Sequence, residues 1–300
     1  MHRGDRVISA AIDRTGTVLL DEGGPALFPW WSFTKPVIAA LVLKASERGL
    51  CDLDAPYDDH PFTLRQLMQH RAGLRDYGPL PSYGAAVAAG EDPWPVERLL
   101  SETRYRDLAY PPGEGWMYSN VGYLLLRQFL ERLHDAPLRD IIETQVCTPL
   151  GLSAKLAETR ADFDRLLWDA KGYHPGWVYH GCLMGTALDA LHLLRALLHG
   201  DVLSEASKTQ MQALAMDGPT IPGRVWRKTG YGLGLMIGEA DPVGRILGHA
   251  GCGPFSANLV AHFPDVPGGP FVASFCPGGD ETPAEFAAVA VAKRHISQDS

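Results

Sequence analysis

The sequence has 300 residues, of which 46% are apolar and 21% are charged, a composition typical of a globular protein with a substantial core. Its net charge of −8, from 27 basic and 35 acidic residues, argues against a nucleic-acid partner, because phosphate binding needs clustered Lys and Arg. No apolar run reaches the roughly 18 residues that a membrane span needs, and the start has no apolar core of signal-peptide length. We therefore expect no membrane partner and a cytoplasmic location.

The first predicted elements are a hairpin and a buried helix. Residues 6–12 and 17–20 are short β-type runs, and the residues between them supply turn chemistry. After a Gly-Gly-Pro breaker, apolar residues fill nearly every face from Val37 to Leu43. This pattern predicts a buried helix that ends near Gly49.

The middle of the chain, about residues 51–230, carries mainly helical signals, whereas glycine-punctuated strands return from residue 231 onward. A closing helix over about 283–296 could be capped by Thr282 and begin at Pro283. The clearest helical segments are 63–70, 96–104, 120–134, 138–146 and 187–200, and the clearest strands are 231–238, 245–251, 257–264 and 270–276.

These signals predict an α/β (α+β) fold, with an antiparallel sheet formed from both chain termini and flanked by helices. Residues 1–50 and 231–300 would form the sheet lobe, and residues 51–230 a mostly helical second lobe. We expect the functional site in the cleft between the lobes.

The cysteines predict neither a disulfide framework nor a zinc site. They are odd in number, with no CxxC pair and no histidine at metal-ligand spacing. We interpret them as reduced thiols that are mostly buried: Cys51, Cys147, Cys182, Cys252 and Cys276.

The first candidate for chemistry is the pair Ser32 and Lys35. A serine hydroxyl is a weak nucleophile until a base accepts its proton, and a lysine three residues later on a helix lies on the same face. The positive end of the helix dipole and partial burial would both lower the pKa of Lys35. An S-x-x-K also arises by chance in a chain of this length, so the pair needs support from elsewhere.

The second candidate is Tyr118-Ser119-Asn120, which follows a loop and precedes a helix. A tyrosine there can transfer protons, and an asparagine can hold a lysine amine and a substrate carbonyl together. The structural alternative is that Asn120 caps the helix and Tyr118 packs.

The third candidate is His249-Ala250-Gly251 on a predicted strand, followed by Cys252. Gly251 would let a substrate backbone approach the strand, and the N–H of the next residue could polarise a carbonyl oxygen together with the N–H of Ser32. An H-x-G alone carries little information.

Taken in order, the three elements resemble the motifs of the penicillin-recognising serine hydrolases, which are S-x-x-K, Y-x-N and K-T-G or H-x-G. Tyr and His at these positions are similar to the branch of class C β-lactamases, D-peptidases and family VIII esterases. The flanking blocks also match over roughly residues 28–265. The resemblance implies a β-lactamase/transpeptidase-like fold.

A literal K-T-G is also present at Lys228-Thr229-Gly230. In the family, a YGLG-type strand precedes the third motif. Here Lys228 comes before Tyr231-Gly232-Leu233-Gly234, whereas His249 comes after it, so we prefer His249.

The resemblance implies that Ser32 attacks an ester or amide carbonyl, that Lys35 and Tyr118 form a proton relay, and that Asn120 orients Lys35 and the substrate. His249 would complete the opposite wall, and no metal or organic cofactor is needed. Which of Lys35 and Tyr118 is the base stays open.

The expected partner is a small ester, amide or β-lactam. Because His249 replaces a permanent cation, a substrate carboxylate would be bound more weakly unless an Arg compensates, and we favour a small ester or small (D-)peptide over a β-lactam. A non-catalytic ligand-binding homologue is the alternative of another class.

Several other residues in this region have open roles. We expect His70 to be structural. An aromatic group either lines the pocket or belongs to the core and surface loops: Trp30, Trp31, Tyr173, His174, Trp177, Tyr179 and His180. The sequence does not predict the oligomeric state.

Overall fold

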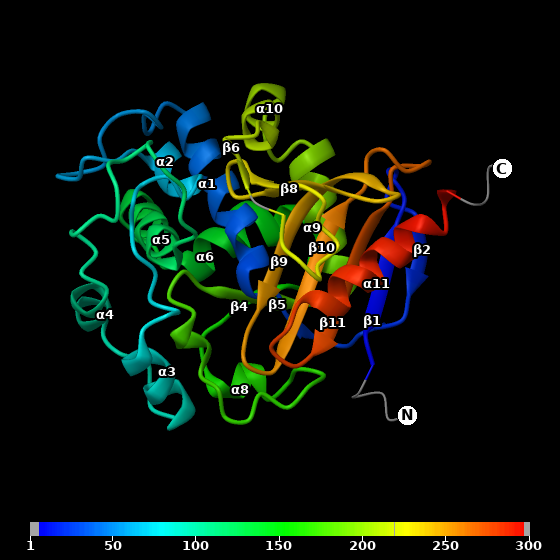
Figure 1. The fold of residues 1–300 in the computed structure, drawn as a ribbon, viewed down its shortest axis with the longest axis horizontal. Helices are drawn as coiled ribbons and strands as arrows, with labels where there is room; N and C mark the ends of the chain where they lie inside the picture. The colour runs from blue at the N-terminus through cyan, green and yellow to red at the C-terminus, as the bar shows by residue number, and fades with distance from the viewer. Residues whose placement is uncertain (1–5, 219, 297–300) are drawn as a thin grey trace.

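The computed structural model describes residues 6–218 and 220–296. In these residues an eight-stranded antiparallel sheet has the order β2-β1-β11-β10-β9-β8-β7-β6, and a small sheet has the order β3-β5-β4 (Figure 1). The large sheet consists of β1 (Ile8–Ile12), β2 (Val18–Asp21), β6 (Met216–Gly218), β7 (Thr229–Tyr231), β8 (Met236–Ala240), β9 (Gly244–Cys252), β10 (Ser256–His262) and β11 (Phe271–Pro277). The small sheet consists of β3 (Phe28–Pro29), β4 (Lys155–Ala157) and β5 (Cys182–Gly185).

Strands from the two ends of the chain lie side by side in the large sheet. Strand β1 pairs with β11, with Ile8 opposite Phe275, and on its other side with β2. The predicted hairpin is therefore present, and its turn is held by the Asp13 carboxylate, which accepts from the backbone N–H groups of Thr15 and Gly16. The predicted antiparallel sheet from both termini is confirmed.

Both faces of the sheet centre are covered by helices. Helix α11 (Thr282–Lys293) and helix α9 (Ala187–His199) contact the same strands, β1, β10 and β11, and lie in front of and behind the sheet in Figure 1. Alternate residues follow this division: Leu259 packs in the cluster under α11, and its neighbour Val260 packs in the main core. Because both faces are buried, β10 is buried along its whole length.

Ser32, the candidate nucleophile, lies in a single 3-10 turn, η2 (Trp31–Phe33). This turn leads directly into the buried helix α1 (Thr34–Glu47). Helix α1 packs against α5 (Asn120–His134) and also contacts β9 and α10 (Glu205–Gln212), which explains its apolar residues on nearly every face. It ends where Gly49 adopts a φ of +70°, as its sequence predicts.

The remaining helical segments are mostly short. They are α2 (Leu64–Met68), α3 (Pro81–Ala88), α4 (Val96–Glu102), α6 (Leu138–Ile142), a π-helical turn η3 (Glu143–Cys147), α7 (Thr148–Leu150), α8 (Arg160–Phe163), η4 (Pro175–Trp177) and α10 (Glu205–Gln212).

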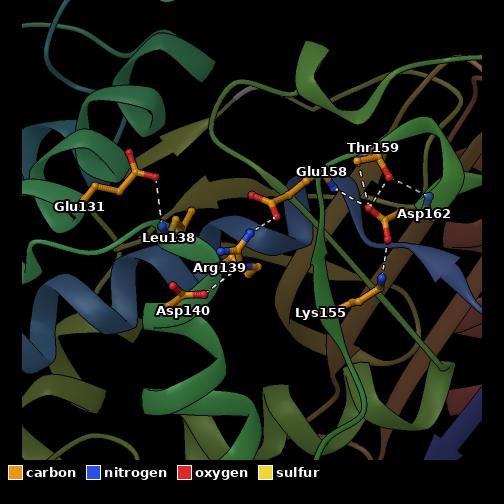
Figure 2. A network of polar contacts seen from close by, with 8 residues as sticks. All are labelled: Glu131, Leu138, Arg139, Asp140, Lys155, Glu158, Thr159 and Asp162. Carbon is orange, nitrogen blue, oxygen red and sulfur yellow. Dashed lines mark hydrogen bonds and ion pairs between the residues drawn. The ribbon is translucent and has the colours of Figure 1, made fainter.

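A surface network connects α6, β4 and α8. Figure 2 shows Arg139 between Asp140 and Glu158, with nitrogen–oxygen distances of 2.8 and 2.6 Å, while Lys155 points to Asp162. Because both Arg139 pairs are exposed, they orient the segments more than they stabilise the fold.

Three details differ from the expectations. Strand β6 and the start of β7 belong to the large sheet although they lie before residue 231, because short strands of three residues leave little periodicity to detect. The N-cap of α11 is Glu281 rather than Thr282, and no side chain caps it. The division into two lobes stays a prediction, and its ranges include residues 1–5, 219 and 297–300, which lie outside the described part.

Candidate active site

The Ser32 hydroxyl lies at the entrance of α1, with Lys35 one turn further along. The Lys35 Nζ is 2.9 Å from the Ser32 Oγ, as the spacing of three residues on a helix allows. On the other side, the Tyr118 hydroxyl donates to the same Oγ over 2.8 Å. The serine oxygen therefore contacts two groups that can exchange protons with it.

The Lys35 amine has no exposed surface. Besides Ser32, it contacts the Asn120 Oδ1 at 2.7 Å and the His180 Nε2 at 3.1 Å. Burial lowers the pKa of Lys35 well below its ordinary value of 10.5, and the carboxylate of Asp76 opposes this in part. The amine is thus biased toward the neutral form that can accept a proton.

Tyr118 is held as a neutral phenol. Burial raises its pKa well above 10.0, against the hydrogen bond with Ser32. Its ring packs on the His70 ring at a centroid distance of 4.3 Å. The direction of the pKa shift is opposite to that of Lys35, so of the two it is the amine that more readily accepts a proton.

Asn120 is the first residue of α5, but Ser119 is the cap, with its hydroxyl accepting from the Gly122 N–H over 3.4 Å. The alternative in which Asn120 caps the helix is therefore wrong. The Asn120 backbone and side-chain N–H groups donate to the Asp76 carboxylate at 2.8 and 3.0 Å, which orients the Asn120 oxygen toward Lys35.

Sequence reasoning missed Asp76 and the contact of His180 with Lys35. Both come from segments far from Ser32 in sequence, and neither stands in a motif that would predict contact with the amine. His70 has a structural position: its Nδ1 accepts from the Ser119 N–H over 3.1 Å, at the start of α5.

His249 lies on β9 at the wall of the site. Its Nε2 is 2.8 Å from the Tyr231 hydroxyl, and its Nδ1 contacts the Ala250 carbonyl oxygen. Burial, reinforced by Lys35, lowers the pKa of His249 to about 3. This position therefore contributes a neutral imidazole and not a cation.

Gly251 makes room for the chain that carries the nucleophile. A Cβ on Gly251 would lie 2.8 Å from the Trp30 carbonyl oxygen and 3.0 Å from the Ser32 nitrogen. The sequence predicts that a substrate backbone approaches Gly251, whereas in the structure the protein's own backbone at Trp30 and Ser32 occupies this position. Trp31, just before the nucleophile, has a φ of +46°, a strained value for a bulky residue.

Two cavities meet at Ser32. The first, of about 440 Å³, is lined by Ser32, Trp116, Tyr118, Asn120, Met216, Gly218, Ile221, Arg224, Thr229, Gly230, Tyr231, Met236, His249, Ala250, Gly251, Cys252 and Glu281. The second, of about 310 Å³, shares Ser32, Asn120 and Cys252 and is otherwise walled mainly by aromatic and small residues. Of the aromatic residues considered from sequence, it contains Trp31, Tyr173, Trp177 and His180, whereas Trp30, His174 and Tyr179 lie elsewhere.

Lys228 lies outside both cavities. It is exposed and pairs with Glu239 at 3.2 Å, while Thr229 and Gly230 line the first cavity. Of the literal K-T-G, only the last two residues reach the site. All five cysteines are free thiols, and Cys252 is the exposed one. Within residues 6–218 and 220–296 no group of three or more His, Cys, Asp or Glu side chains is arranged to hold a metal ion.

Residues 1–289 match the sequence profile of a family described as "Beta-lactamase". The chain belongs to this family. The family resemblance expected from the three motifs is confirmed. No described helix has both the length and the apolar character to cross a membrane.

Curated relatives in the family carry different activities in their names. Penicillin-binding protein 4* of Bacillus subtilis is 25% identical over 280 residues, covering 80% of this chain and 58% of the relative. Lovastatin esterase of Penicillium rubens is 27% identical over 239 residues, covering 64% of this chain and 59% of the relative. The chain therefore spans less than two thirds of the length of these relatives.

Solved structures show the same fold. A D-stereospecific amidohydrolase from Streptomyces has a TM-score of 0.75 at 23% identity, covering 94% of this chain and 93% of that one. A D-amino acid amidase from Ochrobactrum anthropi SV3 has a TM-score of 0.79 at 19% identity, covering 99% and 95%. At these identities the likeness establishes the fold alone.

Proposed function

We propose that this Beta-lactamase family member is a serine hydrolase that forms an acyl-enzyme on Ser32. The observation that carries the proposal is the position of the Ser32 Oγ, 2.9 Å from the Lys35 amine and 2.8 Å from the Tyr118 hydroxyl. A non-catalytic binding protein would have no need of a buried amine and a phenol on one serine oxygen, because burying an amine is costly.

In the first half-reaction Ser32 Oγ bonds to the substrate carbonyl carbon and its proton passes to the neutral Lys35 amine. The opposite pKa directions of Lys35 and Tyr118 favour the amine as this first base. When the tetrahedral intermediate collapses, the bond to the leaving group breaks. Tyr118 gives that group its proton and is reprotonated from the Lys35 ammonium.

In the second half-reaction a water molecule attacks the acyl carbon and loses its proton to the same pair, which gives a proton to the Ser32 Oγ as the bond between that oxygen and the acyl carbon breaks. Asn120 orients Lys35 and reaches the substrate, while the N–H groups of Ser32 and Cys252 stabilise the oxyanion. Asp76 keeps Asn120 in place through two hydrogen bonds.

The substrate class that fits best is a small ester or a small (D-)peptide. His249 is neutral, so the wall that it forms offers no fixed cation to a substrate carboxylate. Relatives named lovastatin esterase and D-aminopeptidase support this choice. The relative named penicillin-binding protein 4* keeps β-lactam hydrolysis as the second candidate.

Intact-protein mass spectrometry tests the nucleophile. The protein is incubated with a fluorophosphonate, a penicillin or a p-nitrophenyl ester, and the wild type is compared with Ser32→Ala and with Ser82→Ala, a matched change at an exposed serine on α3. We expect an adduct in the wild type and in Ser82→Ala but not in Ser32→Ala, with turnover of the ester falling by several orders of magnitude in Ser32→Ala.

The reagents separate the candidate functions. Fast turnover of the ester with slow turnover of the penicillin supports the esterase or peptidase assignment, and the reverse supports a β-lactamase. Absence of an adduct from all three reagents in a folded sample would contradict the proposal and favour the ligand-binding homologue.

A further inference from the structure

One wall of the first cavity carries charge. Arg224 and Glu281 are the two charged residues among the described residues that line it. Arg224 donates through Nε to the Glu285 carboxylate at 2.6 Å and contacts it again through Nη2, and its Nη1 is 3.5 Å from Glu281. The guanidinium is thus engaged by two carboxylates.

The arrangement leaves an excess of negative charge. Glu285 has no exposed side-chain surface and also accepts from the Trp226 indole at 2.7 Å, so its carboxylate is used internally. Glu281 is 27% exposed against 19% for Arg224. One cation faces two anions, and the carboxylate that solvent and ligands can reach is that of Glu281.

The field of Glu281 extends to the residues around the nucleophile. Burial and then Glu281 raise the pKa of the Cys252 thiol to about 12. Glu281 also adds to the burial that raises the pKa of Tyr118. The negative charge of Glu281 therefore acts on the residues beside which a substrate would bind.

The position of Tyr118 indicates which of the two cavities receives the leaving group. In the proposed reaction Tyr118 gives a proton to the leaving group, and Tyr118 lines the first cavity but not the second. The leaving group therefore extends into the cavity that contains Glu281, and the acyl group extends toward the aromatic cavity.

We infer that Glu281 selects substrates whose leaving group carries a cationic amine and disfavours those whose leaving group carries a carboxylate. The inference rests on the proposed function. An incoming carboxylate meets an arginine that is already neutralised and a neutral His249, so nothing described in this cavity offsets its repulsion from Glu281. An amine is attracted by the same uncompensated charge.

Three acetyl thioesters of similar size test the inference with the acyl group held constant: acetylthiocholine, its neutral isostere S-(3,3-dimethylbutyl) thioacetate, and the anionic S-acetyl-3-mercaptopropionate. Acetate release is followed by NMR, which avoids thiol reagents that would modify Cys252. We expect kcat/KM of the wild type to be about tenfold or more higher for the cationic than for the anionic thioester.

In Glu281→Gln this ratio should fall about tenfold, while Glu281→Asp, which keeps the charge, should retain much of it. Glu97→Gln is the matched control, because it removes one carboxylate from an exposed position on α4 outside the cavity, and its ratio should equal that of the wild type.

Two results overturn the inference and leave the proposed function intact: Ser32-dependent hydrolysis of the cationic and anionic thioesters at equal kcat/KM, or a ratio that Glu281→Gln does not change. If none of the three thioesters shows Ser32-dependent hydrolysis, the proposed function fails and the inference fails with it.

Discussion

At the scale of single residues, two opposing effects on the pKa of Lys35 determine the pH range in which its amine can accept a proton. Burial pushes its pKa down, and the Asp76 carboxylate pushes it up. Since Lys35 accepts a proton only when neutral, kcat/KM should rise with pH through the pKa of Lys35 in the free enzyme. The acid limb of the pH profile therefore reports this balance.

We predict that Asp76→Asn moves the acid limb of the kcat/KM profile to lower pH. The substitution removes the charge that stabilises the ammonium, so the pKa of Lys35 falls further. The profile is measured with a neutral ester, so that substrate ionisation does not contribute. A limb that moves to higher pH would contradict the prediction, and a limb that stays in place would show that Asp76 acts on Asn120 alone.

A second prediction at this scale separates the two possible third motifs. Lys228 is exposed, pairs with Glu239 and lines neither cavity at Ser32. Lys228→Ala should therefore leave kcat/KM for a neutral ester within about twofold of the wild type. A loss of about a hundredfold or more is expected for a group that acts in proton transfer, and it would show that Lys228 takes part in the reaction.

At the scale of elements, the site depends on how closely β9 and η2 approach. Gly251 faces the backbone of Trp30 and Ser32, and a Cβ on Gly253 would lie 2.3 Å from the Trp31 ring. The Trp31 indole also donates to the Ser256 hydroxyl on β10 over 3.0 Å. These contacts hold the strained turn that presents the nucleophile.

We predict that Gly251→Ala destabilises the protein by about 1–3 kcal/mol and slows acylation, because the new methyl group must push the nucleophile's turn away from β9. Urea unfolding and the rate of fluorophosphonate labelling measure the two effects. Gly84→Ala in α3 is the control for stability, since its Cβ would meet no atom within 4 Å and a helical alanine is favoured. Equal stability and labelling for Gly251→Ala and the wild type would contradict the prediction.

The parts of this site that sequence predicts are those encoded locally. The Ser32–Lys35 contact follows from one helical turn, and Gly49 ends α1 where a glycine is expected. The motif order also allowed His249 to be preferred over Lys228. Asp76 and His180 reach the Lys35 environment only through tertiary packing, which no spacing in the sequence records.

The length of a strand limits how well the sequence predicts it. Strands β9, β10 and β11 have nine, seven and seven residues and are predicted, whereas β4 and β6 have three residues each. A run of three residues cannot show an alternation, and its pairing depends on the neighbouring strand.

At the scale of the whole molecule, buried histidines connect stability to pH. Burial lowers the pKa of His249 to about 3 and that of His262 to about 4, and it holds the pKa values of His70 and His180 well below 6.5. Below pH 6.5 the unfolded chain binds protons that the folded chain does not. Stability is therefore full above this pH and is lost as the pH falls toward about 4.

We predict that the free energy of unfolding is lower at pH 5.5 than at pH 7.5, by about 1.4 kcal/mol for each of His249 and His262, with His70 and His180 acting in the same direction. Urea unfolding at the two pH values measures the difference. In His262→Gln the difference should shrink by about 1.4 kcal/mol, since one of the four groups is removed. An equal or greater stability at pH 5.5 would contradict the assignment of these histidines as neutral.

The pairing of β1 with β11 also determines when the large sheet can form during synthesis of the chain. The Ser9 and Ser274 hydroxyls are hydrogen-bonded to each other across 265 positions, so β1 cannot pair with β11 until synthesis has passed residue 274. At about 5–20 residues per second this takes roughly 15–50 s of synthesis. Strand β9, which supports the turn of Ser32, emerges late as well. A nascent chain therefore contains Ser32, Lys35 and Tyr118 well before it contains the strand that supports the turn of the nucleophile.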